Sequence, residues 1–352
     1  QSVRNSQKDK LTQFHMDIAA SIQEVTEEIV IKIAKFIKKE FNKENLCLAG
    51  GVALNCVANG KLEKEGIFKN IWIQPAAGDA GGSIGAALAA WHMELKNERK
   101  INLNDAMKGS FLGSSFSQKE VEEQLIELGA SYRSMSNAEI ISETAKCISE
   151  QKAIGWFQGK MEFGPRALGS RSILADPRSK TMQKTLNLKV KYRESFRPFA
   201  PSILSEHLSD YFDLSCQSPY MQFVSLVKND KRYEMSREEE KLFGIEKLNI
   251  VRSNVPAITH VDYSARIQTV EKEINPKFYN LIEKFYQLSG IPMLINTSFN
   301  VRGEPIVCTP LDAYKCFMGT ELDILVIENC FLIKDEQNKN LIEDYKNKYD
   351  LD

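Results

Sequence analysis

Arginine and lysine side chains gather in a short stretch of this sequence, among residues that turn or stiffen the backbone. Positions 151–201 contain 11 Lys and Arg residues against 3 Asp and Glu residues, in a chain whose formal net charge is -1. A guanidinium group can donate two parallel hydrogen bonds to a phosphate or carboxylate, so a fixed arginine is a natural anion ligand. This local excess predicts a compact site for an anion.

Two glycines and a proline frame the first arginines of this stretch. Pro165 fixes its own backbone torsion, and Gly164 and Gly169 permit tight turns. We therefore expect a stiff backbone to present Arg166 and Arg171 to a ligand.

Further along, Lys189, Lys191, Arg193 and Arg197 recur at even spacing. On a β-strand they would share one face, because side chains alternate along a strand. Four such cations repel one another unless an anion intervenes, and Glu194 alone cannot neutralise them. A solvated basic surface is the alternative, but the aromatic residues among them favour a ligand site.

Two later segments add side chains of the same kind. Arg266 stands between small residues, a few positions after His260, and a lone histidine is more often structural than catalytic. A loop that follows a short apolar run carries Ser298 and Asn300, which can donate to phosphate or carbonyl oxygens, and then Arg302. Loops at strand ends are where open α/β sheets bind ligands.

Two glycine-rich turns stand near the start of the chain. Gly50, Gly51 and Val52 lie where an apolar strand passes into a helix, with Asn55 just beyond. The first turn of a helix offers free N–H groups to an anion. In the second turn Asp79 is either a metal ligand or the cap of the next helix, and the residues alone leave both open.

The elements that must position these side chains follow from the spacing of apolar residues. Helices are predicted at 14–36, 52–64, 83–91, 117–129, 137–151, 277–288 and 310–319, and strands at 45–49, 71–74, 153–157, 221–227, 292–295 and 324–327. This alternation predicts an α/β fold. The charged and then Ser/Gly-rich residues 95–118 indicate a boundary between a domain at 1–100 and another at 110–352.

Composition argues against several classes of protein. No apolar run reaches the ~18 residues of a membrane span, and the near-zero net charge argues against a nucleic-acid binder. Seven cysteines without a Cys-x-x-Cys pair favour reduced thiols and a cytoplasmic location. Four histidines, no two of them three or four residues apart, argue against a histidine-rich metal site.

Taken in order over residues 150–330, the basic segments resemble the C-terminal half of the O-carbamoyltransferases of the nodulation-protein and antibiotic type. The two glycine-rich turns resemble the end of an actin-like ATPase domain, in the branch that also contains tRNA threonylcarbamoyl transferases. The resemblance implies an α/β protein in which a partial actin-like (ribonuclease H-like) subdomain precedes a YrdC-like twisted open sheet.

The resemblance also implies a reaction. Such an enzyme forms carbamoyl adenylate from carbamoyl phosphate and ATP with Mg²⁺, and then transfers the carbamoyl group to a hydroxyl of a small-molecule acceptor. The implied ligands of carbamoyl phosphate and the ATP phosphates are Arg166, Lys191, Arg197, Arg266, Ser298, Asn300 and Arg302, with Lys191 and Arg302 catalytic. The first glycine-rich turn, Gly50, Gly51, Val52 and Asn55, would bind nucleotide, and Asp79 a divalent metal such as iron.

This sequence departs from the family in its first domain. The His-x-x-x-His pair and first phosphate loop are not found, since Ala19 follows His15 at the relevant spacing. We therefore expect an incomplete metal site, a missing N-terminal half of the same protein as partner, and an adenylate-forming part alone in this chain. A non-catalytic YrdC-like module that binds nucleotide or RNA, and a sugar-kinase fragment, stay open as alternatives. Under the first interpretation, Arg302→Ala should remove carbamoyl-phosphate affinity and leave the fold intact.

Overall fold

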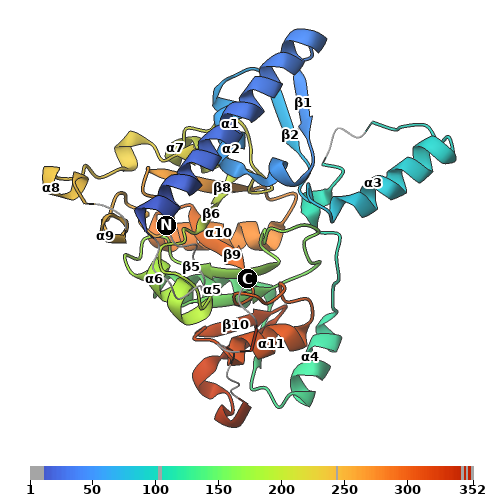
Figure 1. Cartoon of the computed structure of the whole chain (residues 1–352). Helices are drawn as coiled ribbons and strands as arrows, with labels where there is room; N and C mark the ends of the chain where they lie inside the picture. The colour runs from blue at the N-terminus through green and yellow to red at the C-terminus, as the bar shows by residue number, and fades with distance from the viewer. Residues whose placement is uncertain (1–11, 102–104, 243–244, 342–344, 346–347, 350–352) are drawn as a thin grey trace.

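A nine-stranded mixed sheet runs through the larger part of the protein (Figure 1). The computed structural model describes residues 12–101, 105–242, 245–341, 345 and 348–349. The strands lie in the order β3-β11-β10-β4-β5-β9-β6-β8-β7, with β4–β10 and β6–β8 parallel and the other neighbours antiparallel. Their bounds are β3 Arg133–Ser134, β4 Ile154–Phe157, β5 Arg171–Ala175, β6 Ala200–Leu204, β7 Phe223–Leu226, β8 Ser264–Val270, β9 Met293–Ser298, β10 Ile324–Ile327 and β11 Cys330–Ile333.

Helices pack against this sheet in pairs. Helix α10 lies along α5 and against β6 and β9, whereas α11 lies against β10 and β4 and meets α4. The helices of this part are α4 Gln118–Glu127, α5 Asn137–Ser149, α6 Met182–Thr185, α7 Leu208–Tyr211, α8 Arg237–Glu240, α9 Ile245–Leu248, α10 Pro276–Ser289 and α11 Pro310–Met318. Capping boxes begin α4, α5 and α11, and a proline occupies the first turn of α10 and α11.

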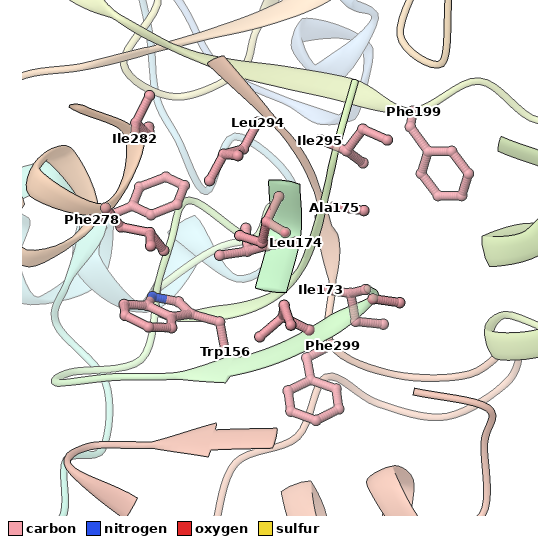
Figure 2. Packing of buried hydrophobic residues seen from close by; sticks show 14 of the residues in the cluster. Trp156, Ile173, Leu174, Ala175, Phe199, Phe278, Ile282, Leu294, Ile295 and Phe299 are labelled. Carbon is pink, nitrogen blue, oxygen red and sulfur yellow. The ribbon is translucent and has the colours of Figure 1, made fainter. Parts of the chain in front are cut away.

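The core fills both faces of the central strands (Figure 2). Leu174 lies with Trp156 and Phe278, while its neighbour Ile173 points to the other side, towards Phe299. Every residue of β4, β5, β6 and β10 is buried. Strands covered on both faces are almost continuously apolar instead of alternating, which explains why the sequence marks β4 and β10 as short apolar runs.

The first part of the chain forms a smaller unit. Its two-stranded parallel sheet, β1 Asn45–Leu48 and β2 Asn70–Ile73, packs with α1 Gln13–Phe41 and α2 Cys56–Lys64, and α3 Gly81–Ala89 follows in sequence. Helix α3 projects away from the rest of the protein in Figure 1 and buries none of its residues. Helix α1 is confirmed, yet the apolar side chains that predicted it are 44–66% exposed: Phe14, Ile18, Ile22, Val25, Ile29, Ile33 and Phe36.

The smaller unit joins the large sheet through α2, which lies on edge strand β7. Asn59 of α2 is buried and donates to the backbone oxygens of Ala53 and Gln222 at 2.8 and 3.1 Å. A Cβ at Gly60 would lie only 2.0 Å from the backbone oxygen of Val224. The contact is therefore close enough to require glycine.

Replacement of Gly60 by alanine is expected to lower the free energy of unfolding by about 1–3 kcal/mol, because helix and strand must move apart. Gly85→Ala is a matched control, since Gly85 is also helical and a Cβ there meets nothing within 4 Å. That control should be stabilising by up to about 1 kcal/mol. Urea unfolding of both variants measures the difference, and equal midpoints would contradict the close contact.

Most predicted elements are confirmed, but one prediction is wrong. The strand interpretation of the basic residues 189–197 does not hold: Lys189 lies in a π-helical turn at Leu186–Val190 that follows α6, and residues 191–197 form no strand, so these side chains do not share a strand face. Strands β3, β5, β6, β8 and β11 were not predicted. Among the described residues, no helix combines the length and apolarity that a membrane crossing requires. The outer ends of the two predicted domains, at residues 1 and 352, lie outside the described residues.

Candidate functional site

A cavity of about 460 Å³ lies beside the start of α2 and the central strands of the large sheet. Four arginines line it: Arg166, Arg193, Arg197 and Arg266. Ser298 and its neighbours on β9 also line it, and Cys56 and Val57 contribute from α2. Four of the predicted ligands, Arg166, Arg197, Arg266 and Ser298, therefore meet in one place although up to 132 positions separate them in the sequence.

Arg166 stands on a loop that one buried carboxylate organises. Oε1 of Glu162 accepts hydrogen bonds from the backbone N–H groups of Leu168 and Ser170 at 2.7 and 2.8 Å, which curl the intervening chain around it. Gly169 has φ +107°, a conformation that disfavours any side chain. Burial raises the pKa of the Glu162 carboxyl, opposed by these hydrogen bonds. The expected stiff loop is present, with a cause that local sequence did not indicate.

Arg171 does not face the cavity, contrary to the prediction. It begins β5, is fully buried, and stacks on the ring of Phe157 at 3.4 Å. Its guanidinium donates to the backbone oxygens of Gln158, Gly159, Ser170 and Ser114 at 3.1–3.2 Å. Backbone carbonyls bind both terminal nitrogens of this guanidinium, and only its buried Nε has no hydrogen-bond partner among the described residues, so its role is structural.

The segment between the π-helical turn and β6 carries two of the cavity's arginines. Arg193 donates from Nε to Oδ1 of Asn187 at 2.7 Å and lies over the ring of Phe199 at 5.2 Å. Arg197 is partly exposed and pairs with Glu194 at 3.2 Å. The same carboxylate pairs with Arg302, also at 3.2 Å, so Glu194 serves two arginines.

Positive charge is in excess in this cavity. Burial, and then Arg266, lowers the pKa of Arg166 to about 10. Burial, and then Arg197, lowers the pKa of Arg193 to about 10. Among the described residues, no carboxylate makes an ion pair with Arg166, Arg193 or Arg266. Like charges this close favour a bound anion.

Lys191 lies behind the cavity wall and not at its surface. Its ammonium donates to the backbone oxygens of Ser298 and Asn300 at 2.5 and 2.9 Å, and contacts Ser298 Oγ and Asn300 Oδ1 at 3.0 and 2.6 Å. Burial, reinforced by Arg193, lowers the pKa of Lys191 to about 7. Lys191 therefore holds the loop after β9 in place, and Asn300 belongs to that support. Arg302 also lies outside the cavity lining, joined to it through Glu194.

His260 lines the cavity next to Arg266, and its ring is held as a neutral group. Its Nδ1 lies 3.1 Å from Oγ of Ser264. Burial lowers the pKa of His260 to about 4; Asp262 raises it and Arg266 lowers it further. As the pH falls from 6.5 to 4, the imidazole of His260 is therefore protonated in the unfolded chain but stays neutral in the folded protein.

Stability should accordingly decline with acidity in this window, because the unfolded state binds more protons than the folded state. Between pH 7 and pH 5 the histidine should remove about 2 kcal/mol of unfolding free energy. Urea unfolding of wild type and His260→Gln at both pH values measures this loss. The variant should lack it, and an equal loss in both proteins would contradict a neutral buried histidine.

The first glycine-rich turn lies in the smaller unit, and its residues do not line the cavity. Gly50 has φ +96° and donates its N–H to the backbone oxygen of Ala77 at 2.8 Å, while Gly51 and Val52 begin a 3-10 helix. Asn55 caps α2 through Ala58 N at 3.1 Å and exchanges hydrogen bonds with Gln23. These contacts give Asn55 a structural role, and nucleotide binding here stays a prediction.

Asp79 is exposed and does not cap α3, so the capping interpretation is wrong. Within the part of the chain that the structure describes, no group of three or more His, Cys, Asp or Glu side chains could hold a metal ion. One carboxylate does not make a metal site. Asp79 as a ligand of a divalent metal, in a site that this chain does not complete, stays a prediction.

Sequence reasoning missed several residues of the cavity. Arg193 lines the cavity, whereas Lys189 of the same basic run pairs with Glu321 outside it. The strand interpretation placed both side chains on one face and so gave no reason to distinguish them. Asn296 and Thr297 directly precede Ser298 and line the same wall. Cys56 follows the first turn, and no local signal indicates that it reaches arginines more than 100 positions away.

Comparison with known proteins gives a consistent result. The model of the carbamoyltransferase C-terminus matches residues 145–334, and that of the carbamoyltransferase N-terminus matches residues 1–88. An uncharacterized protein of Synechocystis sp. is 56% identical over 99% of this chain and 57% of its own length. Nodulation protein NolNO of Sinorhizobium fredii is 41% identical over 92% of the chain and 44% of its own length. For nodulation protein NolO of Bradyrhizobium diazoefficiens the values are 40%, 90% and 54%.

The chain therefore spans about half the length of the curated relatives it matches. These alignments do not show which part of the relatives lies outside the matched region. A missing N-terminal half of the same protein therefore stays a prediction.

Proposed function

Because the chain belongs to the carbamoyltransferase family, we propose that its arginine cavity binds carbamoyl phosphate and ATP phosphates in an ATP-dependent O-carbamoyltransferase. The observation that carries the proposal is the convergence of four arginines on one cavity, of which only Arg197 forms an ion pair with a carboxylate, that of Glu194, among the described residues. Both substrates bring several negative charges to such a site.

The reaction proposed for this cavity is the formation of carbamoyl adenylate. Carbamoyl phosphate is hydrolysed to carbamate and phosphate, and a carbamate oxygen then attacks the α-phosphorus of ATP and displaces pyrophosphate. Negative charge grows on the phosphoryl oxygens in that step, and cations fixed beforehand stabilise it. Arg166, Arg193 and Arg266 would bind these oxygens directly. Lys191 would act by holding Ser298, and Mg²⁺ would arrive with ATP.

The fold assignment belongs to the same proposal. We assign the sheet β1–β2 with α1–α3 to an actin-like subdomain within residues 1–100, and the nine-stranded sheet to a YrdC-like domain within 110–352. The separate sheets and the matches at residues 1–88 and 145–334 support this division. Transfer to a hydroxyl of an acceptor is proposed for the complete enzyme.

Pyrophosphate release from ATP and Mg²⁺, with and without carbamoyl phosphate, tests the proposed reaction. Release that requires carbamoyl phosphate is expected. A folded chain that binds both substrates and releases no pyrophosphate would contradict adenylate formation, and would favour a module that only binds nucleotide.

A further inference from the structure

A buried carboxylate holds the loop that follows β9. Glu304 is 8% exposed, and its Oε2 accepts a hydrogen bond from the backbone N–H of Val301 at 2.8 Å. Its backbone oxygen accepts another from Nδ2 of Asn300 at 2.6 Å. A carboxylate that is removed from water is costly unless donors replace the water. The second oxygen of Glu304, Oε1, therefore needs donors of its own.

Two tyrosines near the end of the chain supply these donors. The hydroxyl oxygens of Tyr345 and Tyr349 lie 2.6 and 3.2 Å from Oε1 of Glu304, and 3.2 Å from each other. Tyr345 is buried, and it packs so closely on the end of α11 that a Cβ at Gly319 would lie 2.3 Å from its ring. Both tyrosines lie beyond residue 334, where the match to the carbamoyltransferase C-terminus ends. The carboxylate is thus held from outside the matched region.

Two hydrogen bonds connect Glu304 with the wall of the arginine cavity. Asn300 donates to the Glu304 backbone oxygen, and its Oδ1 accepts from the hydroxyl of Ser298 at 2.6 Å. Ser298 lines the cavity. The same Oδ1 accepts from the ammonium of Lys191 at 2.6 Å, which fixes the orientation of the Asn300 amide. Movement of the Glu304 backbone would therefore reach Ser298 through a single side chain.

We propose that Tyr345 and Tyr349 are positioning residues of the arginine cavity, an inference that rests on the proposed function. Their hydroxyls fix the Glu304 carboxylate and with it the loop after β9, so that Ser298 keeps the position that a phosphate meets. A site that is fixed before the ligand arrives binds it more tightly, because less ordering accompanies binding. Loss of both hydroxyls should therefore loosen the loop and weaken ligand binding in protein that is still folded.

The double variant Tyr345→Phe/Tyr349→Phe removes both hydroxyls from the full 352-residue chain and keeps both rings. Titration calorimetry with carbamoyl phosphate, at a temperature where the variant is folded, should show roughly threefold to tenfold weaker binding than in wild type. A merely structural role would lower the stability of the variant and leave the affinity of the folded protein unchanged. Wild-type affinity in the double variant would overturn the inference.

Tyr279→Phe is the matched control. The Tyr279 hydroxyl also donates to a carboxylate, that of Glu206, and neither residue lines the cavity. This variant should bind carbamoyl phosphate as wild type does. A loss as large as that of the double variant would overturn the inference, because it would show that the effect does not come from Glu304.

Amide hydrogen exchange tests the same positioning without a ligand. The N–H of Val301 should exchange roughly tenfold faster in the double variant and at the wild-type rate in Tyr279→Phe, because only the double variant releases its acceptor on Glu304. Unchanged protection of Val301 would overturn the inference while leaving the proposed function standing. Failure of the wild-type chain to bind carbamoyl phosphate would overturn the proposed function, and with it the role of the tyrosines in ligand binding.

Tyr349→Phe alone keeps the buried Tyr345 and serves both measurements if the double variant does not fold. It should weaken carbamoyl-phosphate binding roughly twofold to fivefold and speed the exchange of Val301 in the same direction. Wild-type values in both measurements would overturn the inference.

Discussion

Replacement of Glu162 by alanine should lower the free energy of unfolding by about 3–5 kcal/mol, the largest loss of stability that we expect from one substitution. The backbone N–H groups of Leu168 and Ser170 would lose their acceptor inside the protein. The buried guanidinium of Arg171 would also lose the charge of the Glu162 carboxylate, which favours its ionised form. Urea unfolding measures the loss.

Two further variants separate the causes. Glu162→Gln keeps an oxygen for the two N–H groups and removes only the charge, so it should lose about 1–2 kcal/mol. Glu123→Ala removes an exposed carboxylate on α4 that pairs with Lys119 at 3.6 Å, and should change stability by less than about 1 kcal/mol. If Glu162→Ala unfolds at the same urea concentration as Glu123→Ala, the carboxylate does not organise the loop.

Replacement of Arg266 by leucine should weaken carbamoyl-phosphate binding roughly tenfold to hundredfold, the value of one charged hydrogen-bonding partner. Arg266 is fixed by the ladder of β8, where it lies opposite Val224 of β7, and among the described residues no carboxylate pairs with it. Without ligand, the variant should be at least as stable as wild type, because one of several repelling cations has gone.

Lys189→Met is the matched control for Arg266→Leu. Lys189 belongs to the same basic run, but it pairs with Glu321 at 2.7 Å and does not line the cavity. Calorimetric affinity should be unchanged in this control. Wild-type affinity in Arg266→Leu, or an equal loss in both variants, would mean that overall basic charge and not the cavity attracts the ligand.

The position of Arg302 changes the expectation that the sequence raised for it. The structure joins Arg302 to the cavity through Glu194, which also pairs with Arg197. Arg302→Ala should leave Glu194 paired with Arg197 alone, so that the carboxylate neutralises Arg197 more fully. It should therefore weaken phosphate binding less than Arg266→Leu does. The comparison of the two variants decides whether Arg302 contacts the ligand directly.

Local sequence determined the regular elements well where apolar periodicity and end signals agreed. Helix α10 begins with Asn275 as its cap and Pro276 in its first turn, and ends at Gly290 in a left-handed conformation. The predicted helix at 277–288 lies within one residue of it. The failure of the strand interpretation at residues 189–197 has a physical reason as well, at the π-helical turn where that run begins. Leu186 and Val190 are buried one helical turn apart, and this apolar spacing outweighed the even spacing of the charges.

The site was predictable in composition but not in geometry. Glycine and proline around Arg166 indicated a stiff loop, and the loop after β9 indicated hydrogen-bonding groups. The division into cavity-lining and supporting residues depends on contacts between distant positions. Arg171 donates to the backbone oxygen of Ser114, and Lys191 to those of Ser298 and Asn300. The sequence does not distinguish an arginine that donates to backbone carbonyls from one that is free to bind a phosphate.

A crystal structure of the chain with carbamoyl phosphate is the most direct test of the central claim. The phosphate is expected in the 460 Å³ cavity, within hydrogen-bonding distance of Arg166, Arg193 and Arg266. Carbamoyl phosphate bound elsewhere on the protein, or a cavity that stays free of it at a saturating concentration, would contradict the assignment of this cavity as the carbamoyl-phosphate site.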